Sequence, residues 1–186
     1  ELFSNSGSLL SGFPALIDSV VVTSSPHTAD INGDGSKEIY VIGRGTGDVY
    51  TLYAYNGNGQ LVVSAPITDE TVYYEPATLF NGVADSILVS TNDGDIYRFD
   101  YQGGNLTPTR VISGTGSPVA VNVSPSGQIF VTSPSSSSIK IYNNTWALQN
   151  TLSTSNPVLY PVTFGDNDSI YAVTSGQLLG LSSSAG

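Results

Sequence analysis

The sequence predicts an all-β protein, and specifically a four-bladed β-propeller with four-stranded antiparallel blades. Helical periodicity is nearly absent from its 186 residues, whereas short stretches rich in Val, Ile, Tyr, Phe and Thr alternate with turn residues. A unit of several such stretches recurs four times, about every 40 to 50 residues, which is a spacing typical of propeller blades. A β-sandwich with coincidental spacing is the alternative fold.

Each repeat begins with a proline at the head of its first strand. These prolines are Pro26, Pro76, Pro118 and Pro161. The second strands are expected around Ile39, Ile87, Ile129 and Ile170, and the third strands around Val49, Ile96, Ile139 and Leu178. Outer fourth strands are expected from Gln60, Leu106 and Thr145. The predicted blades therefore cover about 18–67, 68–113, 114–153 and 154–182 of a single domain that spans 1–186.

The fourth repeat has no fourth strand of its own. The unassigned apolar segment Ser8–Ile17 is expected to pair in that blade and to close the ring, which would remove an exposed sheet edge. Pro14 suits an outermost strand, where its missing N–H disrupts no ladder. The donor of this strand is either the same chain, which we favour, or a neighbouring copy. Residues 1–7 and 183–186 are expected to form an extension and a tail.

The segment Asp30–Glu38 has the residue pattern of a calcium-binding loop. Oxygen-bearing side chains stand at alternate positions, so a tight turn directs them inward, and calcium takes about six to eight oxygen ligands. Gly35 permits the positive φ that such a turn requires. The expected ligands are Asp30, Asn32, Asp34, the carbonyl of Ser36, and Glu38. An Asx-rich turn held by backbone hydrogen bonds alone is the alternative.

This loop and its flanks resemble the FG-GAP or VCBS-type repeats, which include the calcium loops of integrin α-subunit propellers. The resemblance lies in SGFPALIDSVVVTSSPHTADINGDGSKEIYV and DVYTLYAYNGNGQLV, and it covers roughly residues 11–61. It implies a β-propeller with calcium held between two strands by the five groups just named. An EF-hand does not fit, because Val41 stands at the twelfth position where an acid is needed. The matching turns of the other blades depart from the pattern, so one calcium site is expected.

Charge and composition exclude several classes of partner. The net charge is −10, from 15 acidic and 5 basic residues, and the basic residues are scattered. Nucleic-acid binding needs a basic stripe, and anionic membranes attract basic clusters, so neither is an expected partner. Cysteine is absent and no apolar run is long enough to insert into a membrane. The low charge density and the start at Glu1 predict a secreted, extracellular or cell-surface protein whose signal peptide has been removed.

Catalytic groups are scarce, and we do not expect an enzyme. The chain has a single histidine, His27, and no cysteine, so neither a Cys/His pair nor a His-rich zinc site can be built. A Ser-His-Asp set around His27 is conceivable, but no nucleophile-elbow motif accompanies it. Tyr50, Tyr53, Tyr55 and Tyr97 could form a sugar-binding platform, although packing between blades is the favoured role.

Two classes of function remain. The first is a non-catalytic, calcium-binding structural module that assembles with itself in a cell-surface filament, sheath or matrix. Its support is the uncharged polar surface and the polar ends of the chain. The second is an adhesion or recognition module, integrin-like or lectin-like, that binds other surface proteins or glycans. The family resemblance and the tyrosine content support this alternative.

Overall fold

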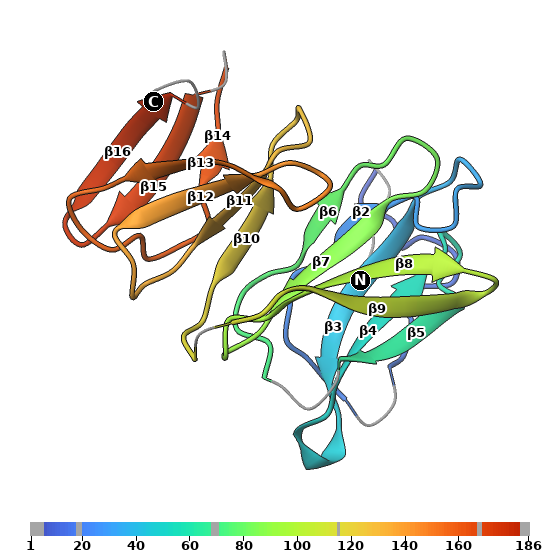
Figure 1. The fold of residues 1–186 in the computed structure, drawn as a ribbon. Coiled ribbons are helices and arrows are strands. Elements are labelled where there is room, and N and C mark those ends of the chain that lie inside the picture. The colour runs from blue at the N-terminus through green and yellow to red at the C-terminus, as the bar shows by residue number, and fades with distance from the viewer. Residues whose placement is uncertain (1–5, 18–19, 68–70, 115, 167–168, 183–186) are drawn as a thin grey trace.

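The structure of the chain is a computed structural model that describes residues 6–17, 20–67, 71–114, 116–166 and 169–182. Four antiparallel sheets follow one another along the chain as the blades of a four-bladed β-propeller (Figure 1). The predicted all-β class and the count of four blades are therefore confirmed. Within the described residues, no helix is long and apolar enough to cross a membrane.

Sheets one and two each contain the strands that the repeats predict. In sheet one, a short turn of 3₁₀ helix, η1 (Thr46–Asp48), precedes the third strand of the repeat. The strands of sheet one are β1 (Val21–Val22), β2 (His27–Ala29), β3 (Glu38–Arg44), β4 (Tyr50–Tyr55) and β5 (Leu61–Ile67). β1 and β2 both pair with β3, so the first strand of this blade is formed by two pieces. The strands of sheet two are β6 (Ala77–Leu79), β7 (Ser86–Ser90), β8 (Ile96–Gln102) and β9 (Asn105–Ile112).

Sheets three and four continue the same order. The strands of sheet three are β10 (Ala120–Val123), β11 (Ile129–Thr132), β12 (Ser138–Tyr142) and β13 (Leu148–Ser153). Within the described residues, sheet four has three strands, β14 (Thr163–Phe164), β15 (Ser169–Thr174) and β16 (Gln177–Ser182). In each sheet a strand begins within two residues of the repeat's proline, namely β2, β6, β10 and β14. Proline lacks an N–H and is therefore tolerated at the start of a strand or on an edge strand.

Apolar side chains hold successive sheets together face to face. β7 illustrates the arrangement, because side chains alternate between the two faces of a strand. Ile87 and Val89 pack in the cluster shared with sheet one, whereas Leu88 packs in the cluster shared with sheet three. A third cluster, which contains Phe130 and Ile170, joins sheets three and four. Strands such as β7 are buried on both faces and read as continuous apolar runs for that reason.

The ring is not closed as predicted. Within the described residues, none of the three apolar clusters joins sheet four to sheet one, and Figure 1 shows these sheets at opposite ends of the molecule. The expected pairing of Ser8–Ile17 in the last blade is wrong, since sheet four consists of β14, β15 and β16 and β16 lies at its edge.

The segment Ser8–Ile17 lies against sheet one instead. Gly12 contacts the turn between β4 and β5 so closely that a Cβ at Gly12 or at Gly59 would clash with backbone atoms of the other segment. Phe13 and Ile17 line a hollow together with side chains of sheet one, among them Ile39. The prediction failed because it considered only the edges of sheet one, which were filled, and not its free apolar face.

Candidate functional site

The predicted calcium loop connects β2 and β3 in blade one, and its first carboxylate organises the turn. Oδ1 of Asp30 accepts hydrogen bonds from the N–H groups of Gly33 and Asp34, at 2.9 and 3.1 Å. Oδ2 accepts a third from the N–H of Gly35, at 2.9 Å. Gly35 has φ +88°, a conformation that glycine adopts without the penalty of a Cβ. The loop is therefore wound around the Asp30 side chain.

The remaining predicted side chains meet at the Asn32 amide. The amide nitrogen of Asn32 donates to Oδ2 of Asp34 at 3.0 Å and lies 3.5 Å from Oε1 of Glu38. The N–H of Ser36 donates to Oδ1 of Asp34 at 2.7 Å, and this backbone hydrogen bond is the main reason why the pKa of Asp34 lies below its usual value. A donor group thus stands between two carboxylates, a position that favours positive charge.

Among the predicted ligands, Glu38 has the greatest need of a positively charged partner, because it is buried, with only 2% of the residue exposed. Its Oε2 accepts a hydrogen bond from the N–H of Ile31 at 3.1 Å. Burial raises the pKa of Glu38, and the nearby charges of Asp34 and Asp30 act in the same direction. A buried carboxylate that faces two other acids is stabilised by a cation, since unpaired buried charge is costly.

The donor set fits calcium in its chemistry, since all the predicted ligands offer oxygen. In the part of the chain that the structure describes, however, no three His, Cys, Asp or Glu side chains are gathered into a metal cluster. The carboxylates are held by N–H donors instead. Calcium binding by Asp30, Asn32, Asp34, the Ser36 carbonyl and Glu38 therefore stays a prediction.

Replacing Glu38 by Gln is expected to have opposite effects with and without calcium. Because the folded pKa of Glu38 is raised, its contribution to stability is fully present below the unfolded pKa and is lost as pH rises through the folded pKa. Without calcium at neutral pH, Glu38→Gln should therefore raise the melting temperature by about 2–4 °C. This shift corresponds to a gain of ~1 kcal/mol in the free energy of unfolding. With calcium the variant should melt below wild type. Melting curves of wild type and Glu38→Gln in chelator at pH 4 and pH 7 test this pH dependence. If the variant gains more in melting temperature at pH 4 than at pH 7, the prediction is contradicted.

The matching hairpins of the other blades each contain a hydrogen bond between neutral groups. In blade two the Asn81 amide donates to the Ser86 hydroxyl at 2.6 Å, and in blade three the Ser124 hydroxyl accepts from the N–H of Gln128 at 3.1 Å. In blade four the N–H of Ser169 donates to the Asp166 carbonyl. The full series Asp30, Asn32, Asp34 and Glu38 occurs only in the blade-one segment of the sequence, whereas blade four has only Asp166 and Asp168. The expectation of one calcium site stays a prediction.

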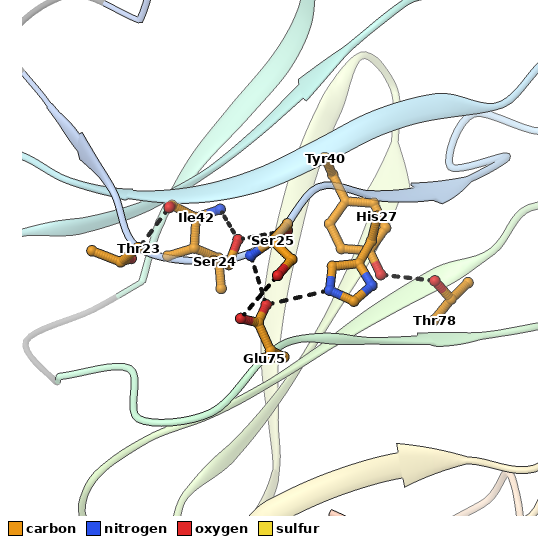
Figure 2. Close-up of polar contacts among 8 residues, drawn as sticks. All are labelled: Thr23, Ser24, Ser25, His27, Tyr40, Ile42, Glu75 and Thr78. Atoms are coloured by element: carbon orange, nitrogen blue, oxygen red, sulfur yellow. Dashed lines mark hydrogen bonds and ion pairs between the residues drawn. The ribbon is translucent and has the colours of Figure 1, made fainter. Parts of the chain in front are cut away.

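A second polar cluster surrounds His27, at the contact between blades one and two (Figure 2). Oε2 of Glu75 accepts a hydrogen bond from the N–H of Ser25 at 2.8 Å and lies 3.4 Å from Nε2 of His27. The hydroxyl of Ser25 is 3.4 Å from Oε1 of the same carboxylate, and the His27 ring stacks on Tyr40 at 5.5 Å. Serine and histidine both face the carboxylate here, whereas a nucleophile relay places the imidazole between hydroxyl and carboxylate.

Tyr40 extends this cluster into the core. Its hydroxyl lies 2.7 Å from the Thr78 hydroxyl of blade two (Figure 2), and burial raises the Tyr40 pKa far above its usual range. Sequence reasoning missed Glu75, which comes from the neighbouring blade. A signal was present, however. Glu75 precedes Pro76 as Ser25 precedes Pro26, so the repeat places the two residues at matching positions.

The tyrosines proposed as a sugar platform mostly pack inside the protein. Tyr50 and Tyr55 are buried, and Tyr97 packs against the cluster between sheets one and two. A different group, which we call the tyrosine patch, consists of the exposed Tyr73 and Tyr160 with the half-buried Tyr74. Within it, the rings of Tyr73 and Tyr74 meet edge to face at 4.7 Å, and the Tyr74 hydroxyl donates to the Leu159 carbonyl at 3.2 Å. Burial raises the pKa of Tyr74, with smaller contributions from Tyr73 and Tyr160.

Comparison with known proteins supports the fold and no more. No family model matches the chain, and no curated protein matches it. Among solved structures, it is similar to the WD40 β-propeller domain of Doa1, with a TM-score of 0.58, 16% identity, and coverage of 84% of this chain and 50% of the other. It is also similar to BamB from Moraxella catarrhalis, with a TM-score of 0.59, 14% identity, and coverage of 87% of this chain and 43% of the other. A gluconolactonase from Xanthomonas campestris has a TM-score of 0.59 and 14% identity, with coverage of 97% of this chain and 63% of the other. The chain thus spans about half the length of these solved structures, and identities this low establish the propeller fold alone.

Proposed function

We propose that this chain is a non-catalytic, extracellular calcium-binding propeller of the FG-GAP or VCBS type that assembles with itself as a structural module of a surface filament, sheath or matrix. The observation that carries the assembly is that sheet four has three strands within the described residues. β16 lies at the edge of sheet four, where β5, β9 and β13 stand as fourth strands in the other sheets. Such an edge presents a row of backbone groups to any strand that can pair with it.

The outward face beside this edge is apolar. In the pairing of β15 with β16, Val173 lies opposite Leu178, so their side chains share a face. Leu178 is 72% exposed, and Tyr171 and Val173 are exposed as well. Apolar side chains on an exposed face next to an open edge are typical of an interaction surface, since single-chain proteins rarely leave such groups together in water.

We infer that the strand which completes sheet four is Ser8–Ile17 of a second copy. The segment is apolar yet poorly covered in its own chain, with Leu16 81% exposed. It contributes no residue to the three core clusters of the described chain, so its release leaves those clusters intact. Sheet one, on which it lies, is at the opposite end from sheet four (Figure 1). A head-to-tail contact of this kind generates polymers or large rings.

Cysteine cross-linking tests the strand exchange, because the chain has no cysteine of its own. One population carries Leu10→Cys and a second carries Leu178→Cys. Mixing them under oxidising conditions should yield a disulfide-linked heterodimer within the assembly. Leu148→Cys, on the outer strand of sheet three, replaces Leu178→Cys in the control. Equal cross-linking of both pairs, or none at all under assembly conditions, would contradict the proposal.

A second candidate function, glycan recognition, is favoured by the tyrosine patch. Tyr73 and Tyr160 are both more than half exposed, and exposed aromatic rings provide faces for apolar contacts. If the patch binds a neutral glycan, Tyr73→Ala and Tyr160→Ala should each weaken binding about tenfold, which equals ~1.4 kcal/mol. Phe80→Ala, which removes another exposed ring, should leave binding unchanged. A glycan array followed by calorimetry measures this, and no binding by wild type would remove the candidate.

A further inference from the structure

The calcium loop is fastened to blade two by one residue that sequence reasoning did not single out. Asp85 lies in the turn between β6 and β7. Its Oδ2 accepts a hydrogen bond from the N–H of Asp30 at 3.0 Å, and its own N–H donates to the Asp30 carbonyl at 2.7 Å. Both backbone polar groups of the first predicted calcium ligand are therefore held by a residue of the neighbouring blade.

The two loops also meet through their backbones. Gly33, with φ +74°, is the point of contact in the calcium loop. A Cβ at this position would lie 3.0 Å from the Val83 carbonyl oxygen and 3.4 Å from the Ala84 Cβ. The approach is closer than a side chain allows without displacement, and it is independent of the Asp85 hydrogen bonds. The calcium loop and the 82–85 turn thus form one contact surface between blades.

We propose that Asp85 is a positioning residue for the calcium loop and that calcium binding, through Asp85, stabilises the junction of blades one and two. This inference rests on the proposed calcium site. Asp85 fixes the backbone of Asp30, whose carboxylate in turn accepts three N–H groups of the loop. Fixing the backbone of a ligand restricts the orientations of its side chain before the metal arrives. Coupling between two sites is reciprocal, so an ion that orders Asp30 also orders Asp85.

Calcium titration of two variants separates positioning from charge. Asp85→Ala removes the oxygen that accepts from Asp30, and it should weaken calcium binding about tenfold, the lower range for residues that orient metal ligands. Asp85→Asn keeps an oxygen acceptor without the negative charge, and it should bind within about threefold of wild type. Asp166→Ala removes an acid from the matching turn of blade four and is the control. If Asp85→Asn weakens calcium binding as much as Asp85→Ala does, the effect comes from the charge of Asp85, and its role as a positioning residue is overturned.

Hydrogen exchange provides a readout that a merely structural role would not change. In wild type, calcium should slow amide exchange both in the loop and in residues 82–88, at least tenfold in each. In Asp85→Ala the loop should still respond to saturating calcium, but residues 82–88 should not. Melting in chelator checks that the variant is folded. No calcium binding in wild type would overturn the site itself, whereas binding with protection confined to blade one would overturn the coupling alone.

Discussion

Calcium at a hundred times its dissociation constant is expected to raise the melting temperature by about 5–10 °C, compared with the same protein in chelator. A ligand that binds only the folded chain at this concentration contributes about 2.7 kcal/mol, and each kcal/mol shifts the melting temperature of a chain of this size by about 2–4 °C. The reason lies in Glu38 and Asp34. Folding brings both carboxylates to the Asn32 amide, an arrangement that the unfolded chain lacks.

Differential scanning calorimetry in chelator and in calcium measures the shift. Asp34→Ala should reduce the calcium-dependent shift to nearly zero, because it removes a carboxylate from the centre of the loop. Asp166→Ala should retain the full shift, since blade four lacks the loop pattern. Magnesium should be less effective than calcium, because it demands a stricter octahedral geometry. A wild-type melting temperature that is the same in chelator and in calcium would refute the site.

The repeat made the strands predictable, because each blade satisfies the same local requirements. A proline marks the start, an apolar run follows, and turn residues end each strand. Strand β7 shows the limit of this reasoning. Its continuous apolar run, Ile87–Val89, predicts a strand buried on both faces. It does not say which sheet covers which face, which depends on the order of the blades.

In the candidate site, too, contacts between residues close in sequence are predictable, whereas contacts between blades are not. Ligands within nine residues of one another, from Asp30 to Glu38, are visible as a pattern because the turn alone brings them together. Asp85 and Glu75 are not, since each reaches its partner across a blade boundary of about fifty residues. Such pairs require the packing of sheets one and two to be known first. The repeat narrows the choice for Glu75, by its place before Pro76, but offers no comparable guide to Asp85.

The N-terminal segment was misplaced for a different reason. The sequence predicts three strands for the fourth repeat, as sheet four has within the described residues, and it marks Ser8–Ile17 as an apolar segment. It could not show that sheet one has a free face nearer in sequence, nor that Gly12 and Gly59 allow two backbones to touch there. High effective concentration favours pairing within one chain. That argument fails when the two ends of the molecule lie apart, and the same facts point to a second copy.

Replacing Leu178 by Glu is expected to abolish assembly while leaving the isolated copy folded. Leu178 is 72% exposed in one copy, so the substitution should change stability by no more than about 0.5 kcal/mol. In the assembled state the same position lies on the apolar face beside the added strand, where an unpaired charge is costly. Negative-stain microscopy should show long assemblies of wild type and isolated particles of the variant.

The matched control is Leu148→Glu, which places the same charge on an outer strand of a sheet that already has its four strands. Leu148 is 54% exposed, and its variant should assemble as wild type does.

The donor strand is tested separately with a synthetic peptide of residues 8–17. The peptide should pair with β16 and, in excess, stop the growth of the polymer, because it carries no propeller to which a further copy could bind. A chain without residues 1–17 should in turn fold and accept this peptide, since the described part of that segment, residues 6–17, contributes nothing to the apolar clusters. If that shortened chain still polymerises, the donor strand is not Ser8–Ile17. If Leu178→Glu assembles normally, the open edge of sheet four is not the place where copies meet.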